Sequence, residues 1–332
     1  MHILRSYKTV PDQLKRAVLA IGNFDGVHRG HQAVLAHARD VARKAEGHAG
    51  ALLFDPHPRV FFQPNLQLFA LTPLPLKLEL MAACGLDLAV VLPFDRELAA
   101  LSADEFVSDV LVDGLGVGHA VIGYDFCFGK GRLGTPEIMT ALGAKYGFGV
   151  TVVAPEGADK EIFSSSGVRA LLRQGEVRVA AEQLGHWWRV RGKVTGGAGR
   201  GHGLGFPTAN IALASGQELA HGIYAARVYM GEERVDGAAY LGTRPTFDDG
   251  PPVLEVFLFD FEEDIYGKDI DVEFLGHIRG DKRFETPEAL SAQIAQDCEA
   301  ARRIIADVDR DDPVAALPIA QSRSRSYVPS PG

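Results

Sequence analysis

Five short apolar segments alternate with helix-like segments over the first half of the chain, and this alternation constrains the fold more than any other feature. The strand-like segments share an apolar run bounded by Gly, Pro or Asp: Val18 to Gly22, Ala51 to Asp55, Leu88 to Pro93, His119 to Tyr124 and Val150 to Ala154. The helix-like segments are His31 to Ala45, Pro75 to Ala83, Ala103 to Val112 and Pro136 to Tyr146. Such alternation predicts a parallel sheet with helices on both faces and ligands at the carboxyl ends of its strands. Ser102 and Thr135 are expected to be N-caps, and Pro136 suits a first helical position.

The turn after the first predicted strand carries a dense polar pattern. It reads Gly22-Asn23-Phe24-Asp25-Gly26-Val27-His28-Arg29-Gly30-His31 and leads into the first helix. Glycines let the backbone approach a ligand, and the first amides of a helix have no partner within it, so they can bind phosphate oxygens. His28 and His31 are three residues apart and would share one helix face. The turn predicts an anion site, with ordinary surface histidines as the alternative. Zinc is disfavoured, because the helical zinc motif needs a spacing of four and an adjacent Glu.

Polar residues also follow other strands of this half. Asp55-Pro56-His57-Pro58 comes after the second strand, and the segment from Gly123 to Arg132 comes after the fourth. The fifth is followed by Phe163-Ser164-Ser165-Ser166-Gly167-Val168-Arg169. The serine hydroxyls and Arg169 predict a second phosphate site, although a serine run before a helix is more often a plain N-cap. These turns are expected at one edge of the sheet.

Length and composition narrow the class of protein. With 332 residues and 46% hydrophobic content, the chain exceeds the usual size of one domain, and two are expected. The net charge of -9 argues against a general binder of nucleic acids or membrane surfaces. Cys84, Cys127 and Cys298 form neither a disulfide framework nor a metal motif. There is no apolar signal segment and no stretch of transmembrane length, so a soluble cytoplasmic protein is expected.

The pattern changes near Gly185, where we predict a domain boundary between residues 185 and 186. Residues 170–184 indicate one or two short helices, and a helix is expected from about Pro287 to Ala306. Strand-like segments follow one another without helices between them: Gly222 to Met230, Val235 to Leu241, Val253 to Phe259 and Asp269 to Leu275. They predict an antiparallel barrel or sandwich. The expected apolar contacts of the last helix are Leu290, Ile294, Ile304 and Ile305. The predicted domains are 1–185 and 186–308, with a disordered tail at 309–332.

Two segments of the second half carry candidate chemistry. A glycine-rich stretch from Gly196 to Gly205 favours a lid that wraps phosphates, with a plain linker as the alternative. Thr208 and Asn210 would share one side of a strand, as two oxygen ligands of Mg²⁺ would, unless they are only a turn residue and a cap. Glu255 would lie on an apolar strand face that suits a general base, with a structural salt bridge as the alternative.

Taken together, these motifs resemble the prokaryotic bifunctional riboflavin kinase/FMN adenylyltransferases, also called FAD synthetases. In the first half the resemblance rests on the Gly22–His31 turn, on Asp55-Pro56-His57-Pro58, on Asp125-Phe126-x-Phe128-Gly129 and on Ser164-Ser165-Ser166-x-x-Arg169. In the second half it rests on Arg200-Gly201-x-x-Leu204-Gly205-Phe206-Pro207-Thr208-Ala209-Asn210, Gly222-Ile223-Tyr224, Gly242-Thr243-Arg244-Pro245-Thr246-Phe247, Glu255 and Tyr266-Gly267-Lys268. The chain departs from the pattern at Cys127, Ser166, His202 and Phe257.

The resemblance implies a multifunctional transferase that handles flavins, a flavoprotein in that sense. A Rossmann-like nucleotidyltransferase domain with a parallel sheet would adenylylate FMN to FAD and release pyrophosphate. An antiparallel riboflavin kinase-like β-barrel with a terminal helix would phosphorylate riboflavin to FMN and leave ADP. Both reactions would use ATP with Mg²⁺. No nucleic acid or membrane partner is expected, and homo-oligomerisation is left open.

The family's functional residues transfer onto matching positions of this chain. The implied catalytic residues are His28, His31 and Arg169 for adenylylation and Glu255 for phosphorylation. Those implied to bind ATP and its phosphates in the first half are Gly22, Phe24, Asp25, Gly26, Asp125, Arg132, Ser165 and Ser166. The flavin side of that site would hold Pro56, His57 and Pro58. In the kinase, the loop residues would be Gly201, Gly205, Phe206, Pro207 and Arg244, and the metal ligands Thr208 and Asn210.

Two alternatives stay open on sequence alone. In one, only one half is active and the other merely binds flavin. In the other, the chain is a flavin or nucleotide sensor that binds its ligands without turnover. The complete set of polar residues in both halves favours the enzyme.

Overall fold

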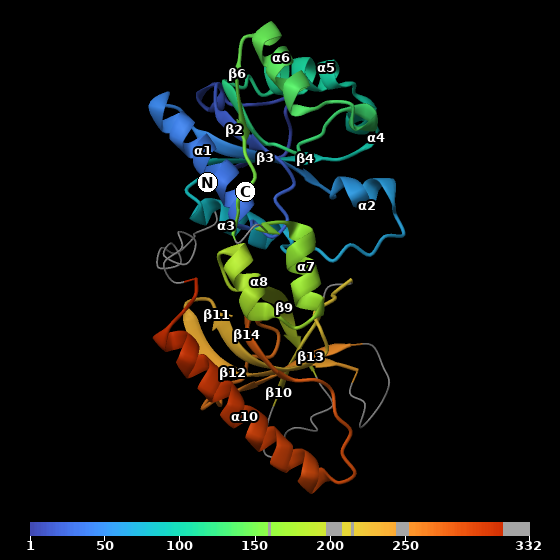
Figure 1. Ribbon diagram of the computed structural model, residues 1–332, viewed down its shortest axis with the longest axis vertical. Coiled ribbons are helices and arrows are strands. Elements are labelled where there is room, and N and C mark those ends of the chain that lie inside the picture. The colour runs from blue at the N-terminus through green and yellow to red at the C-terminus, as the bar shows by residue number, and fades with distance from the viewer. Residues whose placement is uncertain (159–160, 197–207, 214–215, 244–251, 315–332) are drawn as a thin grey trace. The chain divides into compact units, whose positions relative to one another are not determined.

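A computed structural model describes residues 1–158, 161–196, 208–213, 216–243 and 252–314 of the chain (Figure 1). Packing divides it into two compact units, the first beginning with Met1–Ser165 and the second starting at Ser166. Within the described residues, no helix is both long enough and apolar enough to cross a membrane.

The first unit is built on a sheet of six parallel strands in the order β1-β4-β3-β2-β5-β6. The strands are β1 (His2–Leu4), β2 (Val18–Ile21), β3 (Ala49–Asp55), β4 (Leu88–Pro93), β5 (His119–Gly123) and β6 (Gly149–Val153). The predicted parallel sheet is confirmed, and β1 adds an edge strand that sequence did not predict. A short hairpin of β7 (Gly157–Ala158) and β8 (Glu161–Ile162) follows.

Helices cover both faces of this sheet (Figure 1). The helical elements of this unit are η1 (Asp12–Leu14), α1 (Arg29–Lys44), α2 (Pro58–Phe62), α3 (Leu74–Ala83), α4 (Arg96–Ala100), α5 (Ala103–Glu105), η2 (Phe106–Gly114), η3 (Lys130–Arg132) and α6 (Pro136–Tyr146). Leu19 and Ile21 of β2 pack in one core with η2 and α6, whereas α1 contacts the same strands through other buried residues, among them Leu35. The expected helix from Ala103 to Val112 is a short α-helix that continues as the π-helix η2.

The predicted caps of two helices are confirmed. Ser102 accepts a bond from the amide of Glu105, whose carboxylate accepts from the amide of Ser102, which is a complete capping box. Thr135 accepts from the amide of Ile138, and Pro136 stands in the first turn of α6.

The second unit contains a closed six-stranded antiparallel barrel in the order β10-β13-β12-β11-β14-β9. Its strands are β9 (Arg189–Thr195), β10 (Thr208–Ile211), β11 (Gly222–Met230), β12 (Glu233–Gly242), β13 (Val253–Leu258) and β14 (Asp269–Arg279). Closure decides between the two expected architectures, because a barrel leaves no unpaired sheet edge. A tight turn joins β11 and β12, with Gly231 at a positive φ of 66°.

Among the described residues, three helices accompany the barrel: α7 (Ser165–Arg173), α8 (Val177–Leu184) and α10 (Pro287–Arg310). Helix α10 packs on the outer barrel surface. Of its predicted apolar contacts, Ile305 is buried in the shared core and Ile294 and Ile304 are partly buried there, whereas Leu290 is not part of that core. The helix continues past residue 309, where a disordered tail was predicted to begin, and Asp309 pairs with Arg227 at 2.7 Å. The tail from residue 315 onward lies outside the described residues.

Candidate functional site

The turn between β2 and α1 brings the two predicted histidines into contact. His28 is the N-cap of α1, and its Nδ1 accepts a bond from the amide of His31 at 3.3 Å. The two rings stack with centroids 3.5 Å apart and planes inclined by 24°. Strand β2 lies between β3 and β5, where the strand order reverses, which is where open α/β sheets bind their ligands. The turn therefore presents two imidazoles and a helix N-terminus at a favoured ligand position.

Strained and close-packed backbone fixes this turn. Phe24 and Val27 have positive φ values of 50° and 43°, which non-glycine residues seldom adopt. A Cβ on Gly30 would lie 3.2 Å from the ring of His28, and one on Gly22 would lie 3.1 Å from the ring of Phe24. The glycines thus leave room for the two rings beside the backbone, as expected from their places in the motif.

The surroundings of His31 disfavour its charged form. Burial, then the neighbouring His28 and Lys77, hold the pKa of His31 well below the ordinary 6.5. Phe24 meets the ring edge to face, with centroids 5.3 Å apart. The Nδ1 atom of His31 is buried and makes no hydrogen bond among the described residues. His31 is therefore neutral at pH 7, with a ring nitrogen available for a further partner.

Asp25 bonds to the protein's own backbone. Its carboxylate, 5% exposed as a residue, accepts from the amides of Leu71 at 3.2 Å and Thr72 at 3.1 Å. The Thr72 hydroxyl in turn accepts from the amide of Gly26 at 2.8 Å. Asp25 thus ties the histidine turn to the segment before α3, and its expected place at the phosphates of ATP stays a prediction.

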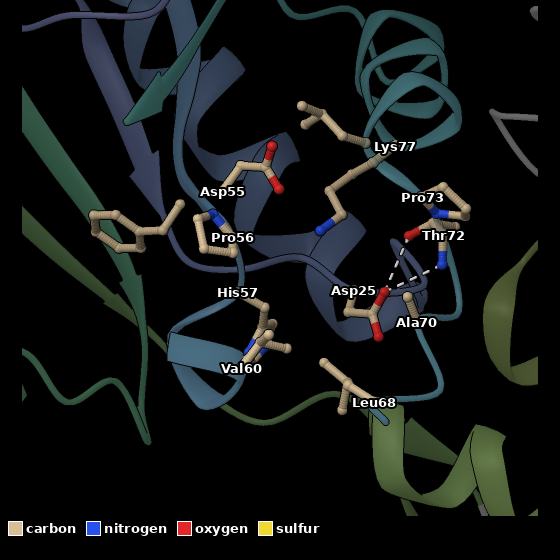
Figure 2. A pocket seen from close by; sticks show the side chains of 12 residues that line it. Asp25, Asp55, Pro56, His57, Val60, Leu68, Ala70, Thr72, Pro73 and Lys77 are labelled. Carbon is tan, nitrogen blue, oxygen red and sulfur yellow. Dashed lines mark hydrogen bonds between the residues drawn. The ribbon is translucent and has the colours of Figure 1, made fainter. Parts of the chain in front are cut away.

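A cavity of about 230 Å³ lies beside this turn (Figure 2). Twelve residues line it: Asp25, Phe54, Asp55, Pro56, His57, Val60, Leu68, Ala70, Thr72, Pro73, Leu74 and Lys77. Pro56 follows a cis peptide bond, and His57 caps α2 by accepting from the amide of Arg59. Two of the three residues predicted on the flavin side thus line the cavity, and Pro58 begins α2 next to them.

Two polar residues of the cavity, Lys77 and Thr72, were not singled out by sequence reasoning. Lys77 lies on α3, only 8% exposed, and its ammonium donates to the carbonyl of Asn23 at 2.8 Å. Thr72 is 2% exposed and bonds to the turn as described above. A lysine within the apolar run Leu74–Met81 was the one available signal, because lysine is seldom buried without a partner.

The remaining predicted residues of the first site lie on two segments, the loop after β5 and helix α7. Asp125 and Arg132 are exposed in the loop after β5, the strand next to β2. The Ser165 hydroxyl donates to the carbonyl of Asp25 at 2.9 Å, so the start of α7 joins the histidine turn. Ser166 and Arg169 belong to the second unit, where Ser166 is exposed and Arg169 is buried on α7.

The barrel brings together the predicted residues of the second site. Asn210 on β10 is directly opposite Glu255 on β13, and Thr208 is opposite Phe257. Along β13 these positions alternate with Leu254 and Val256, which are fully buried. Thr208, Asn210 and Glu255 therefore share one face of adjacent strands, with neighbouring Cβ atoms about 4.5–5.5 Å apart. Glu255 is half-buried there, less enclosed than its apolar neighbours suggested.

The second site has a further neighbour on β12, because Tyr240 is opposite Glu255 on the other side. Sequence reasoning did not include Tyr240, since strand pairing is not visible in the pattern of one strand. The predicted loop residues Gly201, Gly205, Phe206, Pro207 and Arg244 lie outside the described residues.

Comparisons with known proteins assign each half of the chain to a protein family. The family model described as FAD synthetase matches residues 10–167, and the one described as riboflavin kinase matches residues 184–305. Residues 168–183 belong to neither match, so the predicted boundary between residues 185 and 186 stays a prediction.

Relatives similar to the whole chain carry both activities in their names. The bifunctional riboflavin kinase/FMN adenylyltransferase of Escherichia coli strain K12 is 40% identical over 86% of this chain and 91% of its own length. That of Pseudomonas fluorescens is 37% identical over 92% of this chain and 98% of its own. A solved structure titled a macrolide-efflux protein, from Streptococcus pneumoniae, has a TM-score of 0.81 at 28% identity, and the match covers 90% of this chain and 98% of that one.

These matches confirm the predicted enzyme in both halves, against a sensor or a chain with one active half. The chain belongs to the family of bifunctional riboflavin kinase/FMN adenylyltransferases, which phosphorylate riboflavin to FMN and adenylylate FMN to FAD.

Proposed function

We propose that the adenylylation of FMN takes place at the turn between β2 and α1. The observation that carries this proposal is the stacked pair of His28 and His31 at the first turn of α1, where the strand order of the sheet reverses. A helix N-terminus favours negative charge, and the imidazoles add donors beside it. When ATP binds, the Ser165 hydroxyl can turn from the carbonyl of Asp25 and donate to a phosphate oxygen, and Ser166 and Arg169 follow it in sequence.

The reaction at this site needs no protein nucleophile. An FMN phosphate oxygen attacks the α-phosphorus of ATP, and the bond to pyrophosphate breaks. Negative charge builds up on the α-phosphate oxygens, and His28 and His31 stabilise that charge by hydrogen bonding. The cavity beside the turn, lined by Pro56 and His57, receives the flavin part of FMN. Asp125 and Arg132, in the loop after the neighbouring strand, take the nucleotide side, as do Gly22, Phe24 and Gly26 through the turn's backbone.

The phosphorylation of riboflavin is placed at the barrel face that holds Glu255. Its carboxylate accepts the proton of the ribityl 5′-hydroxyl as that oxygen attacks the γ-phosphorus of ATP, and ADP leaves. The register of β10 and β13 supports this role, because Asn210 stands directly opposite Glu255. Gly201, Gly205, Phe206, Pro207 and Arg244 complete the nucleotide and flavin loops of this site, as the family resemblance implies.

Mg²⁺ fits the oxygen donors of the barrel face. Thr208 and Asn210 offer a hydroxyl and an amide oxygen on the face that carries the Glu255 carboxylate, and Mg²⁺ prefers such ligands and usually completes its shell with phosphates and water. When bound, the ion neutralises charge on the transferring phosphates. The described residues contain no cluster of three or more His, Cys, Asp or Glu side chains that could hold a metal, in keeping with an ion that arrives with ATP.

The cellular setting follows from bulk properties. We place the enzyme in the cytoplasm, where its three free cysteines stay reduced. The net charge of -9 supports small-molecule substrates over nucleic acid.

Two single substitutions test the placement of the sites. His31→Gln is expected to slow FAD formation from FMN at least about 100-fold and to leave FMN formation unchanged. Glu255→Gln is expected to do the reverse, with a loss of at least about 100-fold in FMN formation. Matched controls are His37→Gln, an exposed histidine of α1, and Glu233→Gln, an exposed glutamate of β12. Normal FAD formation by His31→Gln, or normal FMN formation by Glu255→Gln, would refute the corresponding placement.

A further inference from the structure

Lys77 is a buried lysine that the reaction described above does not use. It is 8% exposed on α3, a helix whose other buried residues are apolar. Its ammonium donates to the carbonyl of Asn23 at 2.8 Å, in the turn that carries both histidines. Figure 2 shows the side chain reaching from α3 into the space between Pro56 and Asp25. Burying an ammonium costs free energy, so this placement calls for a compensating role.

Among the twelve residues that line the cavity, Lys77 is the one lysine or arginine. Asp25 and Asp55 are the acidic residues of the lining, and the carboxylate of Asp25 is bonded to backbone amides. In the proposed arrangement FMN extends from the cavity, which holds its flavin, to the histidine turn, where its phosphate monoester reacts. A fixed cation at this junction matches it, because the other full charges of the lining repel a phosphate.

We propose that Lys77 is a positioning residue for FMN adenylylation, which holds the histidine turn through the carbonyl of Asn23 and places an ammonium group where the cavity meets the histidine pair. This inference rests on the proposed placement of adenylylation at that turn. Lys77 and the Asp25–Thr72 bonds together tie the segment from Leu71 to α3 onto the turn at two points.

The charge of Lys77 also acts on His31. After burial and His28, the ammonium of Lys77 is the third cause that holds the pKa of His31 below its ordinary value. The other charged groups of the turn point elsewhere, since Asp25 faces the amides of Leu71 and Thr72 and Arg29 lies over the ring of Phe163 at 4.7 Å. Removal of the Lys77 charge should therefore raise the pKa of His31.

The test compares Lys77→Met with Lys77→Arg in the full chain. Methionine keeps the apolar stem of lysine but removes its charge and its hydrogen-bond donor. Arginine keeps the charge and the donor. Lys145→Met, an exposed lysine of α6 paired with Asp104, is the matched control. Circular dichroism and urea denaturation report on the folding of the first unit, and riboflavin phosphorylation by the same molecules reports on the barrel. The readouts are kcat and KM for FAD formation from FMN, and the NMR titration of His31, assigned with His31→Gln.

Lys77→Met is expected to lower kcat for FAD formation at least tenfold with KM for ATP within threefold, and to move the His31 titration to higher pH. Lys77→Arg is expected to keep at least a third of the wild-type kcat, and Lys145→Met all of it. A wild-type kcat in folded Lys77→Met, an equal loss in Lys77→Arg, or an unmoved His31 titration would each overturn the proposal.

Two further variants keep these outcomes separate. If Lys77→Met fails to fold, Lys77→Gln replaces it, because glutamine carries no charge but can still donate to the carbonyl of Asn23. A wild-type rate of FAD formation in Lys77→Gln would overturn the role of the charge. If His31→Gln itself forms FAD normally, the placement of the site fails. If His31→Gln loses FAD formation and folded Lys77→Met does not, only the inference about Lys77 fails.

Discussion

Asn210 and Glu255 are directly opposite each other on the paired strands β10 and β13. The pairing fixes the distance between the proposed metal ligand and the proposed base through backbone hydrogen bonds, not through a flexible loop. If β10 or β13 slipped by one residue, its member of this pair would turn toward the barrel interior, where Ile211 and Leu254 now lie. The barrel core thereby holds the face of the proposed kinase site in register.

The first prediction concerns the metal at this face. Asn210→Ala removes one oxygen ligand and should raise the Mg²⁺ concentration for half-maximal riboflavin phosphorylation at least about tenfold. The Mg²⁺ dependence of FAD formation from FMN, measured on the same preparation, serves as the internal control and should not move. A normal Mg²⁺ requirement for phosphorylation would remove Asn210 from the metal site.

The second prediction concerns the close contact between Gly30 and His28. A Cβ at position 30 would lie 3.2 Å from the His28 ring and 3.4 Å from the carbonyl oxygen of Phe163, so the ring must shift by a few tenths of an ångström. Gly30→Ala should slow FAD formation about tenfold, because small misplacements at a reacting centre are costly. Its unfolding free energy should fall by less than about 1 kcal/mol, since alanine favours helix over glycine. A stable variant with a normal rate would show that the ring position is not critical.

The third prediction concerns Asp25. Asp25→Ala leaves the buried amides of Leu71 and Thr72 without their acceptor and should lower the unfolding free energy of the first unit by about 1–3 kcal/mol. If Asp25 acts only through this bonding, kcat for FAD formation falls and KM for ATP stays within about threefold. Urea denaturation and steady-state kinetics measure the two effects. A large rise in KM for ATP with unchanged stability would instead support a direct contact with the nucleotide.

The fourth prediction follows from the lowered pKa of His31. In the unfolded chain His31 takes up a proton near its ordinary pKa of 6.5, whereas in the folded protein it does so only well below that value. Its contribution to stability is thus complete above about pH 6.5 and is lost as the pH falls from there toward the folded-state pKa. The unfolding free energy of the wild type should drop between pH 7.5 and 5.5, and that of His31→Gln should drop less. An equal drop in the two proteins would contradict the shift.

Much of the architecture was predictable, because the spacing of apolar residues in a long segment shows which of its faces is buried and whether it is a helix or a strand. All five strands of the first half and the helices Pro136–Tyr146 and α10 follow from local pattern and caps. Strand β1 was missed since three residues are too few to show a period. The π-helical continuation of α5 was also missed, because its hydrogen-bond spacing leaves no distinct mark on apolar periodicity.

The candidate sites were predictable only where the residues lie in one motif. His28 and His31 are neighbours on one turn, so their spacing brought them together. Lys77 and Thr72 reach the same turn from about 50 residues away in sequence, and only the fold shows it. Asp25 is a residue type that often binds ligands. Its bonds to the backbone involve Leu71 and Thr72, which sequence alone could not place beside the turn.

The most direct measurement is a chromatographic time course of riboflavin, FMN and FAD with ATP and Mg²⁺, run on two variants apart and mixed. Glu255→Gln alone should leave riboflavin unconverted, and His31→Gln alone should accumulate FMN. The equimolar mixture should form FAD from riboflavin, because each chain keeps one intact site. If the mixture formed no FAD, or if either variant alone completed both steps, two separate sites built on His31 and Glu255 would be contradicted.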